Sequence, residues 1–166
     1  KRLNEFLSIQ PNITNPTSPV MTKLKGDIVF KDVSLVFPHS EITALADFNL
    51  NIKAGQKVLI LGKTGSGKTT IAQLLTRMYE TSTGQILIDG VDVNHFQVQN
   101  LRNDIGYVQQ DVFLFSDTIQ NNIQFGLKEK VSYDDLTHAA KTAHVLNEIN
   151  NLPKQFDTLV GERGTT

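Results

Sequence analysis

The first half of the chain alternates apolar and polar residues, which is typical of β-strands with one buried face. One such run covers residues 28–37, but its phase changes in the middle: the apolar residues are even-numbered up to Phe30 and odd-numbered from Val33. A strand keeps one phase unless an extra residue is inserted, so we expect a bulge near residues 31–32.

Four further segments indicate strands. Residues 48–52 alternate with period two, and residues 84–91 look like a strand that enters a hairpin turn. Residues 57–61 form a short apolar run rich in branched side chains, which indicates a buried strand. Residues 105–108 predict the last strand.

Apolar residues at helical spacing predict the helices. After residue 67 the positions i, i+3, i+4 and i+7 are occupied by Ile71, Leu74, Leu75 and Met78. A short helix is expected around Val98 and Leu101, and the chain beyond residue 110 changes to helical character. The helices expected there cover residues 118–123, with Ser116 or Asp117 as cap, residues 133–143, opened by a capping box over residues 132–135, and residues 145–151.

Composition is that of one soluble domain with a core: 166 residues, 39% hydrophobic and 20% charged. A net charge of −1 gives no basic stripe, so no nucleic-acid partner is expected. Cysteine is absent, the four histidines show no metal-ligand spacing, and no apolar run approaches the length of a membrane span. Residues 1–10 have helical spacing, and the proline-containing residues 11–25 indicate an extended linker.

The strongest chemical signal is a phosphate-binding loop between the strand of residues 57–61 and the helix that follows it. The segment fits G-x-x-x-x-G-K-[ST] and consists of Gly62, Lys63, Thr64, Gly65, Ser66, Gly67, Lys68, Thr69 and Thr70. Its glycines let backbone N–H groups turn towards phosphate oxygens, and the start of the helix adds the positive end of its dipole. Lys68 can reach the β- and γ-phosphates, and the Thr69 hydroxyl can ligate Mg²⁺. The sequence therefore predicts nucleotide binding.

With this loop, three other segments make the chain resemble the nucleotide-binding domain of an ABC transporter, of the exporter type with a fused membrane domain. Residues 33–38 match the family's adenine-stacking A-loop, residues 105–111 its Q-loop, and residues 158–164 its X-loop. The resemblance covers residues 27–164. It stops before the family's signature motif, Walker B strand, catalytic Glu and switch His, so only the first two-thirds of such a domain is matched.

The resemblance implies an α/β fold of the P-loop NTPase type, with an antiparallel β subdomain, a central sheet and a helical subdomain. Residues 1–25 are then the end of the last transmembrane helix and its linker, 26–111 the ATP-binding core, and 112–166 the helical subdomain up to the X-loop. It further implies ATP and Mg²⁺ as ligands, a fused or associated transmembrane domain, and a second nucleotide-binding domain arranged head to tail. The location implied is the cytoplasmic side of a membrane, the bacterial inner membrane.

For several candidate site residues, the sequence allows both a functional and a purely structural interpretation. Phe37, where the family usually has Tyr, is either the adenine-stacking residue or a core aromatic. Gln110 is either the family's contact to Mg²⁺ and the attacking water or an ordinary loop glutamine. Glu162 and Arg163 are either contacts to the membrane domain or solvated loop charges. Asp89 follows an apolar run as a Walker B carboxylate would, but Asp-Gly is a favoured hairpin pair, which favours a turn.

The function that the resemblance implies is ATP binding, with hydrolysis in the complete protein, to drive export. Residues 1–166 alone are expected to bind ATP without normal turnover. Two alternatives stay open: a module that binds nucleotide without hydrolysis, and an ABC-type ATPase of DNA repair or chromosome structure. The X-loop-like segment and the helix-like residues 1–10 disfavour the second of these.

Overall fold

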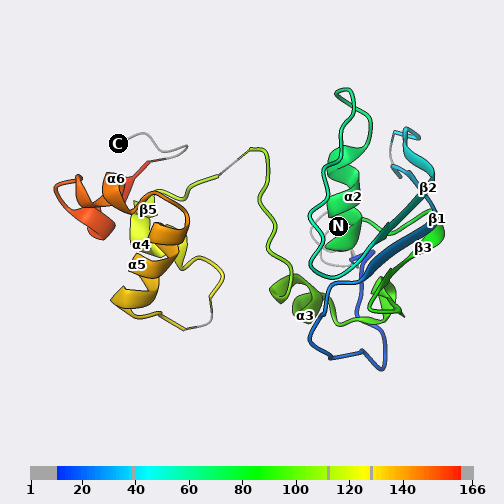
Figure 1. The fold of residues 1–166 in the computed structure, drawn as a ribbon, viewed down its shortest axis with the longest axis horizontal. Coiled ribbons are helices and arrows are strands. Elements are labelled where there is room, and N and C mark those ends of the chain that lie inside the picture. The colour runs from blue at the N-terminus through cyan, green and yellow to red at the C-terminus, as the bar shows by residue number, and fades with distance from the viewer. Residues whose placement is uncertain (1–10, 39, 112, 128, 162–166) are drawn as a thin grey trace, which may run out of the picture. The chain divides into compact units, whose positions relative to one another are not determined.

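The computed structural model describes residues 11–38, 40–111, 113–127 and 129–161. These form two compact units, one ending at Tyr107 and the other beginning at Val108 (Figure 1). In chain order the elements are β1 (Ile28–Val36), β2 (Thr43–Ile52), α2 (Lys68–Leu75), β3 (Thr83–Ile88), β4 (Val91–Asp92), the 3₁₀ turn η1 (Val93–His95), α3 (Val98–Asn103), β5 (Asp117–Thr118), α4 (Ile119–Ile123), α5 (Tyr133–Thr142), α6 (Leu146–Asn150), the 3₁₀ turn η2 (Gln155–Asp157) and β6 (Leu159–Val160).

An antiparallel sheet with the strand order β2-β1-β3-β4 forms the frame of the first unit. The predicted bulge is confirmed: the register of β1 against β2 shifts between Phe30 and Val33, and Asp32 has a φ of 47°. Gly84 of β3 lies so close to this bulge that a Cβ there would collide with the carbonyl oxygens of Lys31 and Asp32. Only glycine fits opposite the bulge, which explains why the second residue of β3 has no side chain.

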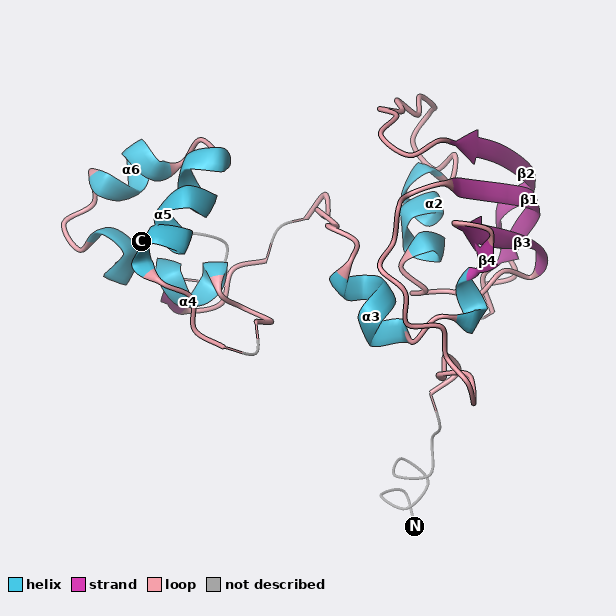
Figure 2. Cartoon of the chain, turned by 60° about the horizontal axis from the view of Figure 1, so that its bottom comes forward, coloured by secondary structure: helices cyan, strands magenta, loops and turns pink. Residues whose placement is uncertain are grey.

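Helix α2 packs against one face of this sheet, as the ribbon in Figure 2 shows. Its apolar stripe buries Ile71 and Leu74, as the helical spacing predicts. The helix ends at Leu75, however, so Met78 lies beyond it and is 39% exposed. The core between helix, sheet and α3 consists of Phe30, Val33, Leu35, Leu45, Ile71, Leu74, Ile86, Ile88, Val93, Phe96 and Leu101.

The predicted strands at residues 57–61 and 105–108 were wrong, because neither segment forms a ladder in the structure. Leu59 and Leu61 are 80% and 81% exposed, and Val108 is 89% exposed. Strands of a parallel sheet need a hydrogen-bonded neighbour and cover on both faces. None of the strands in the described part of the chain pairs with these two segments. The expected central sheet is therefore not formed by these residues.

The second unit is helical, with a short β5–β6 pair and a small core of Leu136, Ala140, Ile149 and Phe156. The predicted capping box of α5 is confirmed: the Ser132 hydroxyl accepts the Asp135 N–H at 3.2 Å, and the Asp135 carboxylate accepts the Ser132 N–H at 3.3 Å. The Ser132 hydroxyl also donates to this carboxylate and so lowers the pKa of Asp135. The cap of α4 is Thr118, which accepts the Asn121 N–H, and not Ser116 or Asp117 as expected.

Among the residues that the structure describes, no helix combines the length and the apolar character needed to cross a bilayer. The helix expected over residues 1–10 lies outside the described residues.

Candidate phosphate-binding site

The loop of residues 62–67 turns sharply into helix α2. Gly65 and Gly67 have φ angles of 79° and 81°, in the left-handed region that other residues adopt only at a cost. Between them the Ser66 N–H donates to the Lys63 carbonyl at 3.2 Å, which closes a turn. Gly67 is the N-cap of α2 and has no side chain to cap it. The sequence pattern of the loop therefore corresponds to a specific backbone path.

Gly67 also lies where the loop touches the sheet. A Cβ at this position would collide with the carbonyl oxygen of Ala44 and lie 2.9 Å from Leu45 Cδ2. Both residues belong to β2, whose position is set by its pairing with β1. The absence of a side chain at Gly67 thus lets the start of α2 sit against the edge of the antiparallel sheet.

The first turn of α2 presents backbone donors that the protein itself does not use. In the described part of the chain, no hydrogen bond starts from the N–H groups of Lys68, Thr69 or Thr70, and the first N–H with a partner is that of Ile71. Such groups at a helix start, together with the helix dipole, attract anions. Thr69 is exposed, whereas Thr70 is 6% exposed and its side chain is part of the packed interior.

The Lys68 ammonium lies over its own loop. Its Nζ donates to the carbonyls of Gly62 and Lys63 at 2.8 and 2.7 Å and approaches Ser66 Oγ at 3.5 Å. An ammonium has three donors, so a phosphate oxygen can take the place of the weak third contact while the two carbonyls hold the amine. Lys68 therefore stabilises the loop and carries a positive charge at the point where phosphates would bind.

Phe37 follows β1 at the tip of the β1–β2 hairpin and is half-buried. Its ring meets that of Tyr79 edge to face, with 5.1 Å between the ring centroids, and it packs at the margin of the core. This packing agrees with the core-aromatic interpretation of Phe37, although the sequence did not identify Tyr79 as its partner. Adenine stacking by Phe37 stays a prediction.

The remaining candidates lie elsewhere in the chain. Gln110 is exposed and belongs to the second unit, whereas Thr69 belongs to the first, so their joint contact to Mg²⁺ stays a prediction. Glu162 and Arg163 lie outside the described residues.

Asp89 is a turn residue, as the sequence favoured. Asp89 and Gly90 have φ angles of 53° and 81°, and they join β3 to β4. The Asp89 carboxylate accepts hydrogen bonds from backbone N–H groups of residues 25–27. Asp89 therefore holds the segment that precedes β1. The sequence pattern, an apolar run followed by Asp, did not indicate this role.

Most of the chain matches known proteins. Residues 45–164 match the family model described as ABC transporter. The chain is 42% identical over 142 residues to an "ATP-dependent lipid A-core flippase" of Methylobacillus flagellatus, an alignment that covers 86% of the chain and 24% of that protein. It is 40% identical over 161 residues to the flippase of the same description from Haemophilus influenzae, covering 97% of the chain and 27% of the flippase.

Among solved structures, a bacterial Atm1-family ABC exporter with ATP bound matches with a TM-score of 0.90 and 35% identity. That match covers 98% of the chain and 29% of the exporter. The chain spans about a quarter of the length of the relatives it matches. Because the family model covers well over half of the chain, this polypeptide is a member of the ABC transporter family.

Proposed function

We propose that this chain forms the ATP-binding part of an ABC exporter. The observation that carries the proposal is the turn of residues 62–67 into α2, with the free N–H groups of Lys68, Thr69 and Thr70 and the Lys68 ammonium at one place. This donor set suits the β- and γ-phosphates of a nucleoside triphosphate. The similarity to an exporter whose structure has ATP bound supports the same ligand here.

In this proposal the residues bind and position the nucleotide. The loop amides and Lys68 hold the phosphates, and the Thr69 hydroxyl and Gln110 are the proposed protein ligands of Mg²⁺. Bound Mg²⁺ would neutralise phosphate charge and polarise the phosphoryl group. These groups fit the ligands by chemistry: N–H and ammonium donors for phosphate, and an exposed hydroxyl oxygen for a hard cation.

The complete protein is proposed to hydrolyse ATP and to drive export across a membrane. Its partners are a fused or associated transmembrane domain, which Glu162 and Arg163 contact, and a second nucleotide-binding domain placed head to tail. The proposed location of the ATP-binding part is the cytoplasmic side of the bacterial inner membrane. The names of the matched flippases and exporter support this proposal.

Replacing Phe37 with alanine tests whether the adenine of the nucleotide stacks on the Phe37 ring. The Phe37→Ala variant is expected to lose ~1–3 kcal/mol of ATP affinity, because stacking on an aromatic ring contributes about that much per base. Phe37→Tyr keeps the ring and is the matched control, expected to bind ATP as the parent does. Titration with a fluorescent ATP analogue and with inorganic triphosphate, which has no base, measures the effect.

Triphosphate affinity should stay unchanged in both Phe37 variants. If Phe37→Ala binds ATP as tightly as the parent, Phe37 is only the packing partner of Tyr79, and adenine is held elsewhere. Equal losses for ATP and triphosphate would instead indicate that the variant has disturbed the loop.

A further inference from the structure

Residues 14–27, called the strap below, lie along the first unit ahead of β1 and are held to it at several points. Near the start of the strap, the Val98 N–H donates to Asn15 Oδ1 at 2.8 Å. In its middle, the Val20 N–H donates to the His95 carbonyl at 2.8 Å. The linker predicted from the sequence is thus a docked segment with specific contacts.

Asp89 anchors the end of the strap. Its carboxylate accepts three consecutive backbone N–H groups, those of Lys25, Gly26 and Asp27, at 2.6, 3.1 and 3.0 Å. Partial burial alone raises the pKa of Asp89, but these three hydrogen bonds and the nearby Lys25 charge lower it below its ordinary value. A charged carboxylate is therefore the form that holds the strap.

Arg77 joins the strap to the C-terminal end of helix α2. Its side chain is 3% exposed and pairs with Glu80 at 3.3 Å. The same guanidinium donates to the carbonyls of Thr14 and Phe96 at 3.2 and 3.3 Å. Arg102 in turn donates to the Arg77 carbonyl at 2.7 Å, at the end of the helix. The helix that starts at the phosphate loop therefore ends in direct contact with the strap.

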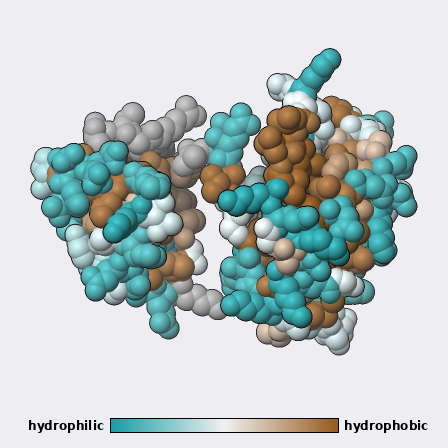
Figure 3. Space-filling model, in the orientation of Figure 1, coloured by the Kyte–Doolittle hydropathy of each residue, from teal (hydrophilic) through white to brown (hydrophobic). Residues whose placement is uncertain are grey.

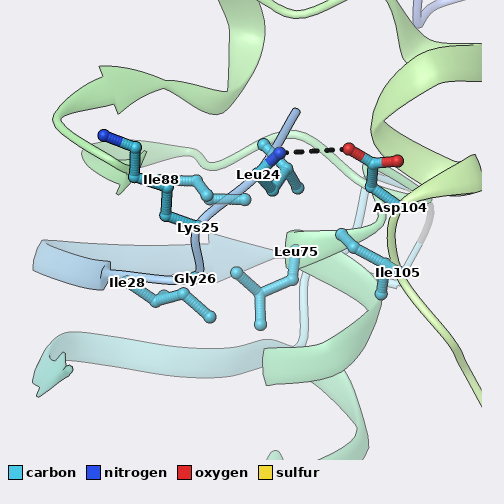
Figure 4. A pocket seen from close by; sticks show the side chains of 8 residues that line it. All are labelled: Leu24, Lys25, Gly26, Ile28, Leu75, Ile88, Asp104 and Ile105. Atoms are coloured by element: carbon cyan, nitrogen blue, oxygen red, sulfur yellow. Dashed lines mark hydrogen bonds between the residues drawn. The ribbon is translucent and has the colours of Figure 1, made fainter. Parts of the chain in front are cut away.

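A pocket of about 300 Å³, partly open to solvent, is lined by the end of the strap. In Figure 4 the strap backbone crosses this hollow, and the Leu24 N–H donates to the Asp104 carboxylate at 3.1 Å. Apolar side chains of the strap, of α2, of the sheet and of the segment after α3 surround it: Leu24, Ile28, Leu75, Ile88 and Ile105. The strap is therefore held both by hydrogen bonds along its length and by the packing of Val20 and Leu24 against the core.

We infer that the strap is a conformational relay between the chain that precedes it and the phosphate loop. Asp89 keeps it docked, and Arg77 makes the position of α2 depend on that docking. Strap docking and nucleotide binding therefore stabilise each other, since coupling between two sites is reciprocal. The coupling rests on the proposed function, whereas the anchoring role of Asp89 does not.

Asp89→Asn tests the anchor without breaking the turn. Asn-Gly is a favoured pair for a turn with two positive φ angles, so the β3–β4 hairpin is kept while the carboxylate is lost. Hydrogen exchange at the amides of residues 25–27 is expected to become about tenfold faster, because hydrogen bonds to a charged group are weakened. Exchange in β1 and β2 should not change. Asp92→Asn is the matched control, since among the described residues that carboxylate accepts only the local Asn94 N–H and should leave strap exchange unaltered.

The relay is tested by adding saturating Mg·ATP to the same proteins. In the parent and in Asp92→Asn, nucleotide should slow exchange of the strap amides. In Asp89→Asn, Mg·ATP should bind about fivefold more weakly, in the range typical of coupled sites. A purely structural anchor would change strap exchange without changing nucleotide affinity.

Each result decides one point. Parent-like strap exchange in Asp89→Asn would overturn the anchor. Faster exchange with unchanged Mg·ATP affinity, or a strap that does not respond to nucleotide, would overturn the relay and leave Asp89 as an anchor only. If the parent fails to bind Mg·ATP, the proposed function and the relay both fail, while the nucleotide-free comparison still decides the anchor.

Discussion

Replacing Lys68 with alanine is expected to weaken Mg·ATP binding by about 100-fold or more. Charge-assisted hydrogen bonds contribute ~1.5–3 kcal/mol each, and a tenfold change in affinity corresponds to about 1.4 kcal/mol. Lys68 is placed at the loop by its bonds to the Gly62 and Lys63 carbonyls, so its ammonium is already oriented before a phosphate arrives. Titration of a labelled ATP analogue measures the loss.

Lys57→Ala is the control for the loss of one positive charge close to the loop, because Lys57 is exposed and lies five positions before Gly62. It should bind ATP nearly as the parent does. Thermal unfolding of both variants checks that the loop change has not unfolded the first unit. Unchanged ATP affinity in a folded Lys68→Ala protein would mean that residues 62–70 do not bind phosphate.

Residues 1–166 alone are expected to release no phosphate from saturating Mg·ATP above the level of the Lys68→Ala protein. The resemblance to the family assigns no residue of this chain to the catalytic Glu or the switch His. The Asp at the end of an apolar strand, Asp89, is engaged with the strap and lies in a turn. Steady phosphate release that Lys68→Ala abolishes would show that these residues are catalytically sufficient.

The same preparation should associate with itself or be of low stability. Apolar side chains at residues 58–61 are between 38% and 81% exposed, and their backbone is unpaired in the described structure. Brown apolar surface in Figure 3 lies on the part of the first unit that carries α2. Exposed apolar segments of this kind promote association. Light scattering should therefore report a mass above that of one chain, whereas a stable monomer would contradict the expectation.

Local sequence signals predicted the bulge and the β3–β4 turn of the antiparallel sheet and the start of helix α5. The change of phase after Phe30, the Asp89-Gly90 turn and the capping box at Ser132 are each determined by residues close in the chain. These local structures need only residues that are close in the sequence, and those residues are part of this chain. The turn of residues 62–67 into α2 was predicted for the same reason, because glycines at fixed spacing determine its backbone, whereas phosphate binding by this turn stays a prediction.

The two predicted strands that failed both depended on distant partners. Residues 57–61 have the composition of a buried parallel strand, yet in the described structure they have no neighbouring strand to pair with. Apolar content alone cannot supply the hydrogen bonds that a strand needs. The contacts of Asp89 and Arg77 with the strap were missed for a related reason. They join residues more than sixty positions apart, and no local pattern marks them.

Backbone amide chemical shifts during titration with Mg·ATP test the central claim most directly, namely that the loop of residues 62–70 binds nucleotide phosphates. The largest shifts are expected at the N–H groups of Lys68, Thr69 and Thr70, which donate to no other group in the described structure. The shifts should saturate, and inorganic triphosphate should reproduce them. Saturating shifts that leave residues 62–70 unchanged, or no shifts at all, would contradict the account.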